Sequence, residues 1–242
     1  MIYAFNFTCN RDLDLSMLMT STLKKHCHNI SISVTNTDVD PEFKGYGNGS
    51  GWPQSMLKLK RLRQIVQTYD IKPDDFILSV DSDVVFTSPE VFKHVNPEYG
   101  IIGTKHRPDF HTALGMWSHM SGALIFIRGD IAKKMSDLTD VQLDHIRYQH
   151  FKTNNLTENE DVVLSYLASV CGANYFDLGT VPGLTSGDFE SEVWTENENK
   201  FGVRSFLKSF YHLNYCPTEF LGRPVVGKWS IPSVLKEKGI EL

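Results

Sequence analysis

An apolar run that ends in two carboxylates constrains this chain most: residues 76–86 read Phe-Ile-Leu-Ser-Val-Asp-Ser-Asp-Val-Val-Phe. The first five of these residues predict a buried strand, which Asp81 and Asp83 follow directly. Positions i and i+2 of an extended chain point the same way, so we expect both carboxylates to project together. Neighbouring negative charges are costly unless they are neutralised, and a hard divalent cation completed by a diphosphate does this. The alternative is a solvated Asp-Ser-Asp turn, which the apolar residues after the motif disfavour.

The rest of the chain alternates strand and helix patterns. Residues 2–7 form an apolar stretch, helical spacing follows over 15–26, and alternation over 30–34 predicts a second strand. Such a β-α-β opening implies parallel strands. We therefore expect one α/β domain over residues 1–242, with a mostly parallel central sheet flanked by helices. Residues 179–205 are expected to be a loop-rich excursion.

Composition excludes several classes of protein. The net charge is −5 over 242 residues, so the chain has no general basic field for nucleic acid. Its four cysteines are far apart and form no zinc-binding pair, which favours free thiols in a reducing compartment. No apolar run reaches the roughly 18 residues of a membrane span, and Met1 runs directly into the first strand. We expect a cytoplasmic protein without a membrane span.

The Asp-Ser-Asp motif resembles the D-x-D motif of GT-A nucleotide-sugar glycosyltransferases. Three further motifs occur in the order typical of that superfamily: the small-residue strand 121–127, Asn159-Glu160-Asp161 at a helix start, and His212 followed by Gly227-Lys228-Trp229. The sequence is also similar to short glycosyltransferase domains of bacterial polysaccharide clusters and large algal viruses. The resemblance implies a GT-A-like fold, a nucleotide-diphosphate sugar donor, expected to be a UDP-sugar, and a glycan or other hydroxyl acceptor. It implies a nucleotide-binding half over 1–103 and an acceptor- or sugar-binding half over 104–242.

The same resemblance implies a metal site made of Asp81, Asp83 and His212. Imidazole together with carboxylates suits Mn²⁺ better than Mg²⁺. The alternative for His212 is a histidine that only satisfies its own hydrogen bonds in an aromatic strand, and the residues alone leave both open. Some relatives have a lysine soon after the histidine, whereas Lys228 is more distant, so Arg223 is an alternative phosphate ligand.

Asp161 is the expected general base, with Glu160 as the alternative for the same role. A carboxylate beneath the acceptor hydroxyl can take its proton as the oxygen attacks the anomeric carbon. We expect inversion of configuration by direct displacement. The competing interpretation is that acidic residues at a helix start stabilise the helix dipole.

Donor-binding residues are expected at the carboxyl end of the first strand, where ligands of open α/β sheets bind. These residues are Phe7, Thr8, Asn10 and Arg11. Further donor contacts are expected at Trp52, Lys58, Asp81, Ser82, Gly122 and Lys228. The glycine-rich stretch 45–51 is either a flap over the donor or a plain surface turn; it lacks the lysine-serine ending of a P-loop.

A second function class fits the same motif. Phosphatases of the haloacid dehalogenase type have a nucleophile motif that matches Asp81-Ser82-Asp83-Val84, with Asp81 as the nucleophile. That motif usually ends the first strand of its domain, whereas here a complete β-α-β unit precedes it. A nucleotidyltransferase and a non-catalytic sugar-binding module are further alternatives. The first usually has a glycine-rich basic loop after its first strand, and the second needs neither the carboxylate pair nor Asp161.

Overall fold

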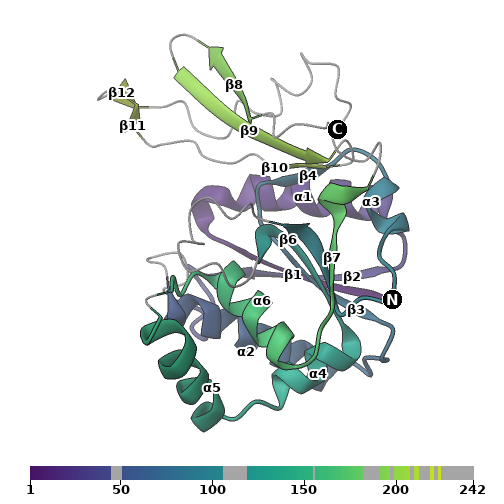
Figure 1. The fold of residues 1–242 in the computed structure, drawn as a ribbon. Helices are drawn as coiled ribbons and strands as arrows, with labels where there is room; N and C mark the ends of the chain where they lie inside the picture. Colours follow the sequence, from purple (N-terminus) through teal and green to yellow (C-terminus); the bar gives the residue numbers. More distant parts are fainter. Residues whose placement is uncertain are drawn as a thin grey trace.

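The structure is a computed structural model, and it describes most of the first 181 residues together with the backbone of several later strands. The described ranges are 1–44, 51–105, 119–154, 156–181, 191–196, 199–207, 210–212, 219–220 and 223–224. In this part of the chain, helices cover both faces of a six-stranded mixed sheet (Figure 1).

The central sheet has the strand order β2-β1-β3-β6-β5-β7. Its strands are β1 (Ile2–Thr8), β2 (Ile30–Asn36), β3 (Phe76–Val80), β5 (Ile101–Lys105), β6 (Met120–Arg128) and β7 (Tyr175–Asp177). Strands β1 and β2, β1 and β3, and β5 and β7 pair in parallel, whereas β6 is antiparallel to both β3 and β5. All strands except β6 therefore run the same way, which confirms the predicted mostly parallel α/β sheet.

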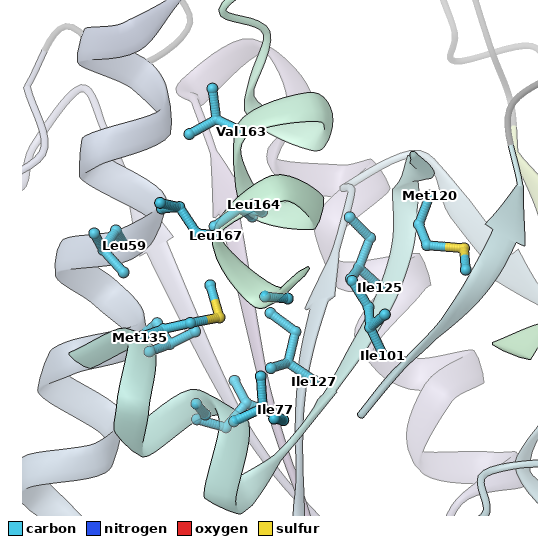
Figure 2. Packing of buried hydrophobic residues seen from close by; sticks show 14 of the residues in the cluster. Leu59, Ile77, Ile101, Met120, Ile125, Ile127, Met135, Val163, Leu164 and Leu167 are labelled. Atoms are coloured by element: carbon cyan, nitrogen blue, oxygen red, sulfur yellow. The ribbon is translucent and has the colours of Figure 1, made fainter. Parts of the chain in front are cut away.

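Two hydrophobic layers hold the helices against this sheet. The helices are α1 (Leu13–His26), α2 (Trp52–Thr68), α3 (Glu90–Lys93), α4 (Gly129–Ser136), α5 (Asp140–Ile146) and α6 (Glu160–Val170). Figure 2 shows Leu59 of α2, Met135 of α4 and Leu167 of α6 packed over the sheet face that carries Ile77. The next residue, Leu78, points to the opposite face, where α1 packs, as the alternation of side chains in a strand requires.

A second sheet has the strand order β4-β10-β9-β8 and lies on the α1 side of the molecule (Figure 1). Its strands are β4 (Val84–Phe86), β8 (Ser191–Glu196), β9 (Asn199–Leu207) and β10 (Phe210–His212). A two-stranded pair follows, made of β11 (Glu219–Phe220) and β12 (Arg223–Pro224). The expected loop-rich excursion over 179–205 is therefore wrong in part, because β8 and β9 form an antiparallel pair. Val193, Trp194 and Thr195 at the centre of β8 are residue types that are common in strands, and the pairing with β9 completes this hairpin.

None of the helices in the described part of the chain is both long enough and apolar enough to cross a membrane.

Candidate active site

Asp81, Ser82 and Asp83 connect the two sheets. They form a turn between β3, which is buried along its length, and β4. The amide of Asp81 donates to the carbonyl of Ala123 at 3.1 Å, and the amide of Val84 donates to the carbonyl of Asp81 at 3.3 Å. The two carboxylates are not equally exposed, because Asp83 is 8% exposed whereas the side chain of Asp81 is 34% exposed. The motif is a turn, as the alternative interpretation held, but its second carboxylate is buried rather than solvated.

Asn6 ties this turn to β1. Its Nδ2 donates to the carbonyl of Val80 at 2.9 Å and to Oγ of Ser82 at 3.2 Å. Its Oδ1 accepts from Oγ of Ser16 in α1 at 2.7 Å. Oγ of Ser82 in turn donates to the carbonyl of Phe7 at 2.8 Å. The sequence pattern shows Asn6 only as a polar residue inside an apolar strand, and its role was missed.

Lys58 is the buried cation of the site. Its side chain is 3% exposed, and its Nζ lies 3.6 Å from Oδ1 of Asp81 and 3.1 Å from Oε1 of Glu160. It belongs to α2, directly before Leu59 of the hydrophobic core. A buried ammonium needs opposite charge close by, which the two carboxylates supply. The lysine therefore joins the end of β3 to the start of α6.

A pocket of about 230 Å³ lies beyond the carboxyl ends of β1 and β3. Its lining residues are Phe5, Phe7, Asp12, Lys58, Ser79, Val80, Asp81, Ser82, Asp83 and Glu160. The carboxyl edge of a mostly parallel sheet is where open α/β folds bind ligands. The structure thus brings together six of the expected site residues: Phe7, Lys58, Asp81, Ser82, Asp83 and Glu160. Asp12 is a further lining carboxylate that the sequence analysis did not single out.

Trp52 does not reach this pocket. It is 6% exposed and packs edge to face on Phe151, with 5.6 Å between ring centroids. The guanidinium carbon of Arg147 lies 5.4 Å from the Trp52 ring centroid. Its indole belongs to the core beneath the start of α2, because burying a large aromatic surface is strongly favourable, and the donor contact expected at Trp52 stays a prediction.

The other expected residues at the end of β1, Thr8, Asn10 and Arg11, are not among the residues that line this pocket, and their donor contacts stay predictions. Thr8 is 4% exposed, and its carbonyl accepts from the amide of Thr37 at 2.8 Å. Oδ1 of Asn10 accepts from Nδ2 of Asn36 at 2.8 Å. The Arg11 side chain is 67% exposed and pairs with Asp12 at 2.8 Å, a hydrogen bond that raises the pKa of the arginine.

Asp161 lies beside the pocket, at the second residue of α6. Its Oδ1 accepts from the amide of Val162 at 2.8 Å, and its Oδ2 lies 3.6 Å from Nε2 of His119. Gly122 approaches it closely, since a Cβ at that position would be 3.3 Å from Cβ of Asp161. Gly122 therefore belongs to the surroundings of Asp161 rather than to the pocket lining. His119 carried no signal in the sequence that singled it out as a site residue.

The donor set at the turn fits a hard divalent cation. Two carboxylates face one pocket, and Mg²⁺ or Mn²⁺ commonly takes one or two carboxylates and completes its shell with substrate phosphates. In β10, His212 pairs with Val84, the residue after Asp83, so the backbone brings this histidine next to the motif. Among the described residues, no group of three or more His, Cys, Asp or Glu is placed to hold a metal ion. Lys228 and residues 45–50 lie outside the described residues.

Comparisons with known proteins gave matches among solved structures only. No protein-family model matches the sequence, and neither does any curated protein. The galactosyltransferase LgtC, solved with donor and acceptor sugar analogues, is 10% identical with a TM-score of 0.47, covering 74% of this chain and 74% of LgtC. The catalytic domain of Drosophila β1,4-galactosyltransferase 7 with xylobiose is 14% identical with a TM-score of 0.46, covering 97% of this chain and 79% of that domain.

A viral enzyme is also similar. A glycosyltransferase involved in glycosylating the major capsid of PBCV-1 is 12% identical with a TM-score of 0.44, covering 75% of this chain and 84% of that enzyme. All three similar structures are glycosyltransferases, the class that the four sequence motifs resemble. These likenesses are distant, and the function of this chain depends on its own residues.

Proposed function

We propose that this protein is a metal-dependent glycosyltransferase that moves a sugar from a nucleotide-diphosphate donor, a UDP-sugar, to a hydroxyl of a glycan or similar acceptor. One observation carries the proposal: Asp81, Asp83, Lys58 and Glu160 meet in one pocket at the carboxyl edge of the sheet. An anionic diphosphate requires positive charge there, and the carboxylates provide the place for a divalent cation.

The two carboxylates of the motif, Asp81 and Asp83, would have different roles. Asp83 is the more buried carboxylate and would hold Mn²⁺, or Mg²⁺, together with the histidine of β10. The bound cation would neutralise the charge that develops on the diphosphate as the bond between sugar and oxygen breaks. Because Lys58 already neutralises part of Asp81, this carboxylate is better suited to an outer contact or to the ribose than to direct ligation.

Acceptor activation is assigned to Asp161, with Glu160 as the alternative. Glu160 is the weaker candidate because its Oε1 lies 3.1 Å from the Lys58 ammonium and is already engaged in that ion pair. Asp161 faces His119 and the start of β6 instead. A base on the acceptor side supports direct displacement with inversion of configuration.

The phosphatase alternative has less support. Its nucleophile motif belongs at the end of the first strand, whereas Asp81 follows β3, and the end of β1 carries Asn6, Phe7 and Thr8. The pocket takes residues from both expected halves, Asp81 from 1–103 and Glu160 from 104–242, and that division remains a prediction. The cytoplasmic location likewise remains a prediction from the sequence.

A donor screen tests the proposed function. UDP-, GDP-, ADP- and CMP-sugars would be incubated with the protein, with and without Mn²⁺, and release of the free nucleotide measured. We expect release from one UDP-sugar that depends on Mn²⁺ and stops in excess chelator. Phosphate release from p-nitrophenyl phosphate, with no turnover of any nucleotide sugar, would instead support the phosphatase.

A further inference from the structure

The main-chain ladder between β1 and β3 stops just short of the Asp-Ser-Asp turn. Its last pair in register is Phe5 with Ser79. Beyond this point Asn6 bonds to the carbonyl of Val80 and to Oγ of Ser82, as described above. The amide side chain therefore continues the connection between the two strands where the backbone no longer does.

Every hydrogen-bonding group of the Asn6 amide is used. Both N–H groups of Nδ2 have acceptors, and Oδ1 accepts from Ser16. The residue is 1% exposed, so water does not compete for these bonds. A fully satisfied buried polar network is rigid, since any rotation of the amide leaves a buried group unpaired. Asn6 thus anchors the residue before the motif and its central residue to β1 and α1.

We propose that Asn6 is a positioning residue that fixes the Asp81-Ser82-Asp83 turn and thereby sets the affinity of the carboxylate pair for a divalent cation. Ser82 lies between the two carboxylates, and its side chain is held from two sides, by Asn6 and by the carbonyl of Phe7. Residues that orient metal ligands without touching the ion typically change metal affinity about 10- to 100-fold. The cation part of this inference rests on the proposed function; the fixing of the turn does not.

Three variants separate this role from general stability. Asn6→Leu keeps the size of the side chain and removes all its hydrogen bonds. Ser16→Ala removes only the donor to Oδ1 and serves if Asn6→Leu does not fold. Thr22→Val is the matched control: Thr22 is 2% exposed, and its Oγ1 accepts from the amide of Phe86 at 3.2 Å, in β4 rather than in the turn.

Two measurements are made on the full chain. Amide hydrogen exchange without metal reports the turn, and Mn²⁺ titration followed by electron paramagnetic resonance reports the affinity. In Asn6→Leu we expect faster exchange at the amides of Asp81 and Val84 and an Mn²⁺ dissociation constant raised about 10- to 100-fold. Ser16→Ala should give a smaller change in the same direction. Thr22→Val should leave both the turn amides and the Mn²⁺ affinity as in the unmodified protein.

The outcomes distinguish this inference from the proposed function. Folded Asn6→Leu or Ser16→Ala protein with unchanged exchange and unchanged Mn²⁺ affinity would overturn the role of Asn6. An equal loss of affinity in Thr22→Val would also overturn it, because general stability would then explain the effect. No Mn²⁺ binding by the unmodified protein would overturn the metal-dependent function and the cation part of this inference, while the exchange rates would still decide whether Asn6 fixes the turn.

Discussion

Lys58 and Glu160 form an ion pair of 3.1 Å between Nζ and Oε1, which joins the middle of α2 to the first residue of α6. The same ammonium lies 3.6 Å from Asp81. The buried ammonium therefore offsets part of the negative charge that Asp81 and Glu160 bring to the lining of the pocket. In the proposed function, this ammonium would be the fixed positive charge that meets the diphosphate of the donor.

Lys58→Met tests whether Lys58 contacts the donor. Methionine keeps much of the aliphatic volume, but it leaves the carboxylates of Asp81 and Glu160 without their shared cation, so the free energy of unfolding should fall. Because both carboxylates are about one-third exposed and solvent can compensate in part, we expect a loss of about 1–3 kcal/mol, and binding is measured on the folded variant. UDP affinity should fall because the fixed positive charge is gone. Affinity for Mn²⁺ alone should rise, because Asp81 loses its competing cation. Calorimetric titration checks both, and unchanged UDP affinity would contradict a donor contact by Lys58.

Asp83→Asn should remove a charged cation ligand while keeping the shape of the turn. Turnover of the donor should fall by about two or more orders of magnitude if the cation stabilises the leaving diphosphate. Initial rates at several Mn²⁺ concentrations measure this effect. Asp12→Asn is the comparison, since it neutralises another pocket carboxylate outside the motif. Full activity of Asp83→Asn in excess chelator is incompatible with the proposed metal site.

Asp161→Asn should leave donor binding intact, because the amide has the same shape and Asp161 does not line the pocket. Its transfer rate should drop by about 10²- to 10⁴-fold, the usual share of general-base catalysis. Proton NMR of the product independently determines the anomeric configuration. A product with retained configuration would exclude direct displacement and leave Asp161 as a positioning group.

Gly122→Ala should displace Asp161 slightly. The added Cβ would lie 3.3 Å from Cβ of Asp161, a tight contact that requires the start of α6 to give way by a few tenths of an ångström. We expect the turnover number to fall about 10-fold or more while the KM for donor stays nearly constant, because misplaced catalytic groups cost rate rather than binding. A turnover number equal to that of the unmodified protein would show that catalysis does not depend on the exact position of Asp161.

Acidification should weaken the contact that holds the segment before α6. Arg147 donates to Glu158 at 2.7 and 2.9 Å, and this hydrogen bonding holds the pKa of the Glu158 carboxyl below its ordinary value of 4.5. A lowered folded-state pKa stabilises the protein fully above the unfolded value, and this stability is lost as pH falls through the folded value. Denaturant unfolding measured from pH 7 to pH 3 should therefore show a larger loss of unfolding free energy in the unmodified protein than in Arg147→Met. We expect a difference of about 1–2 kcal/mol, which allows for an arginine side chain that is 35% exposed. Parallel curves for the two proteins would show that the pair contributes no pH-dependent stability.

Local patterns in the sequence were enough for the order and type of the first elements. Helical spacing and strand alternation predict β1, α1, β2 and β3 within a few residues of their observed bounds, because each pattern reports which side of one element is buried. The same patterns identified Asp81 and Asp83 after a buried strand and the acidic start of α6. Such features depend on residues close together in the chain, so the sequence by itself determined them.

Contacts between residues far apart in the sequence decided the other parts of the fold and of the site. Lys58 meets Glu160 because α2 lies against α6, and Trp52 packs on Phe151, which lies far away in the sequence. Asn6 reaches Ser82 only because β1 and β3 are neighbours in the sheet. β8 pairs with β9 along its whole length, a partnership that its own short sequence does not reveal. No local pattern shows which helix covers which strand, and the free energy of burying a lysine or orienting an asparagine depends on those neighbours, so only the tertiary structure decided these parts of the site.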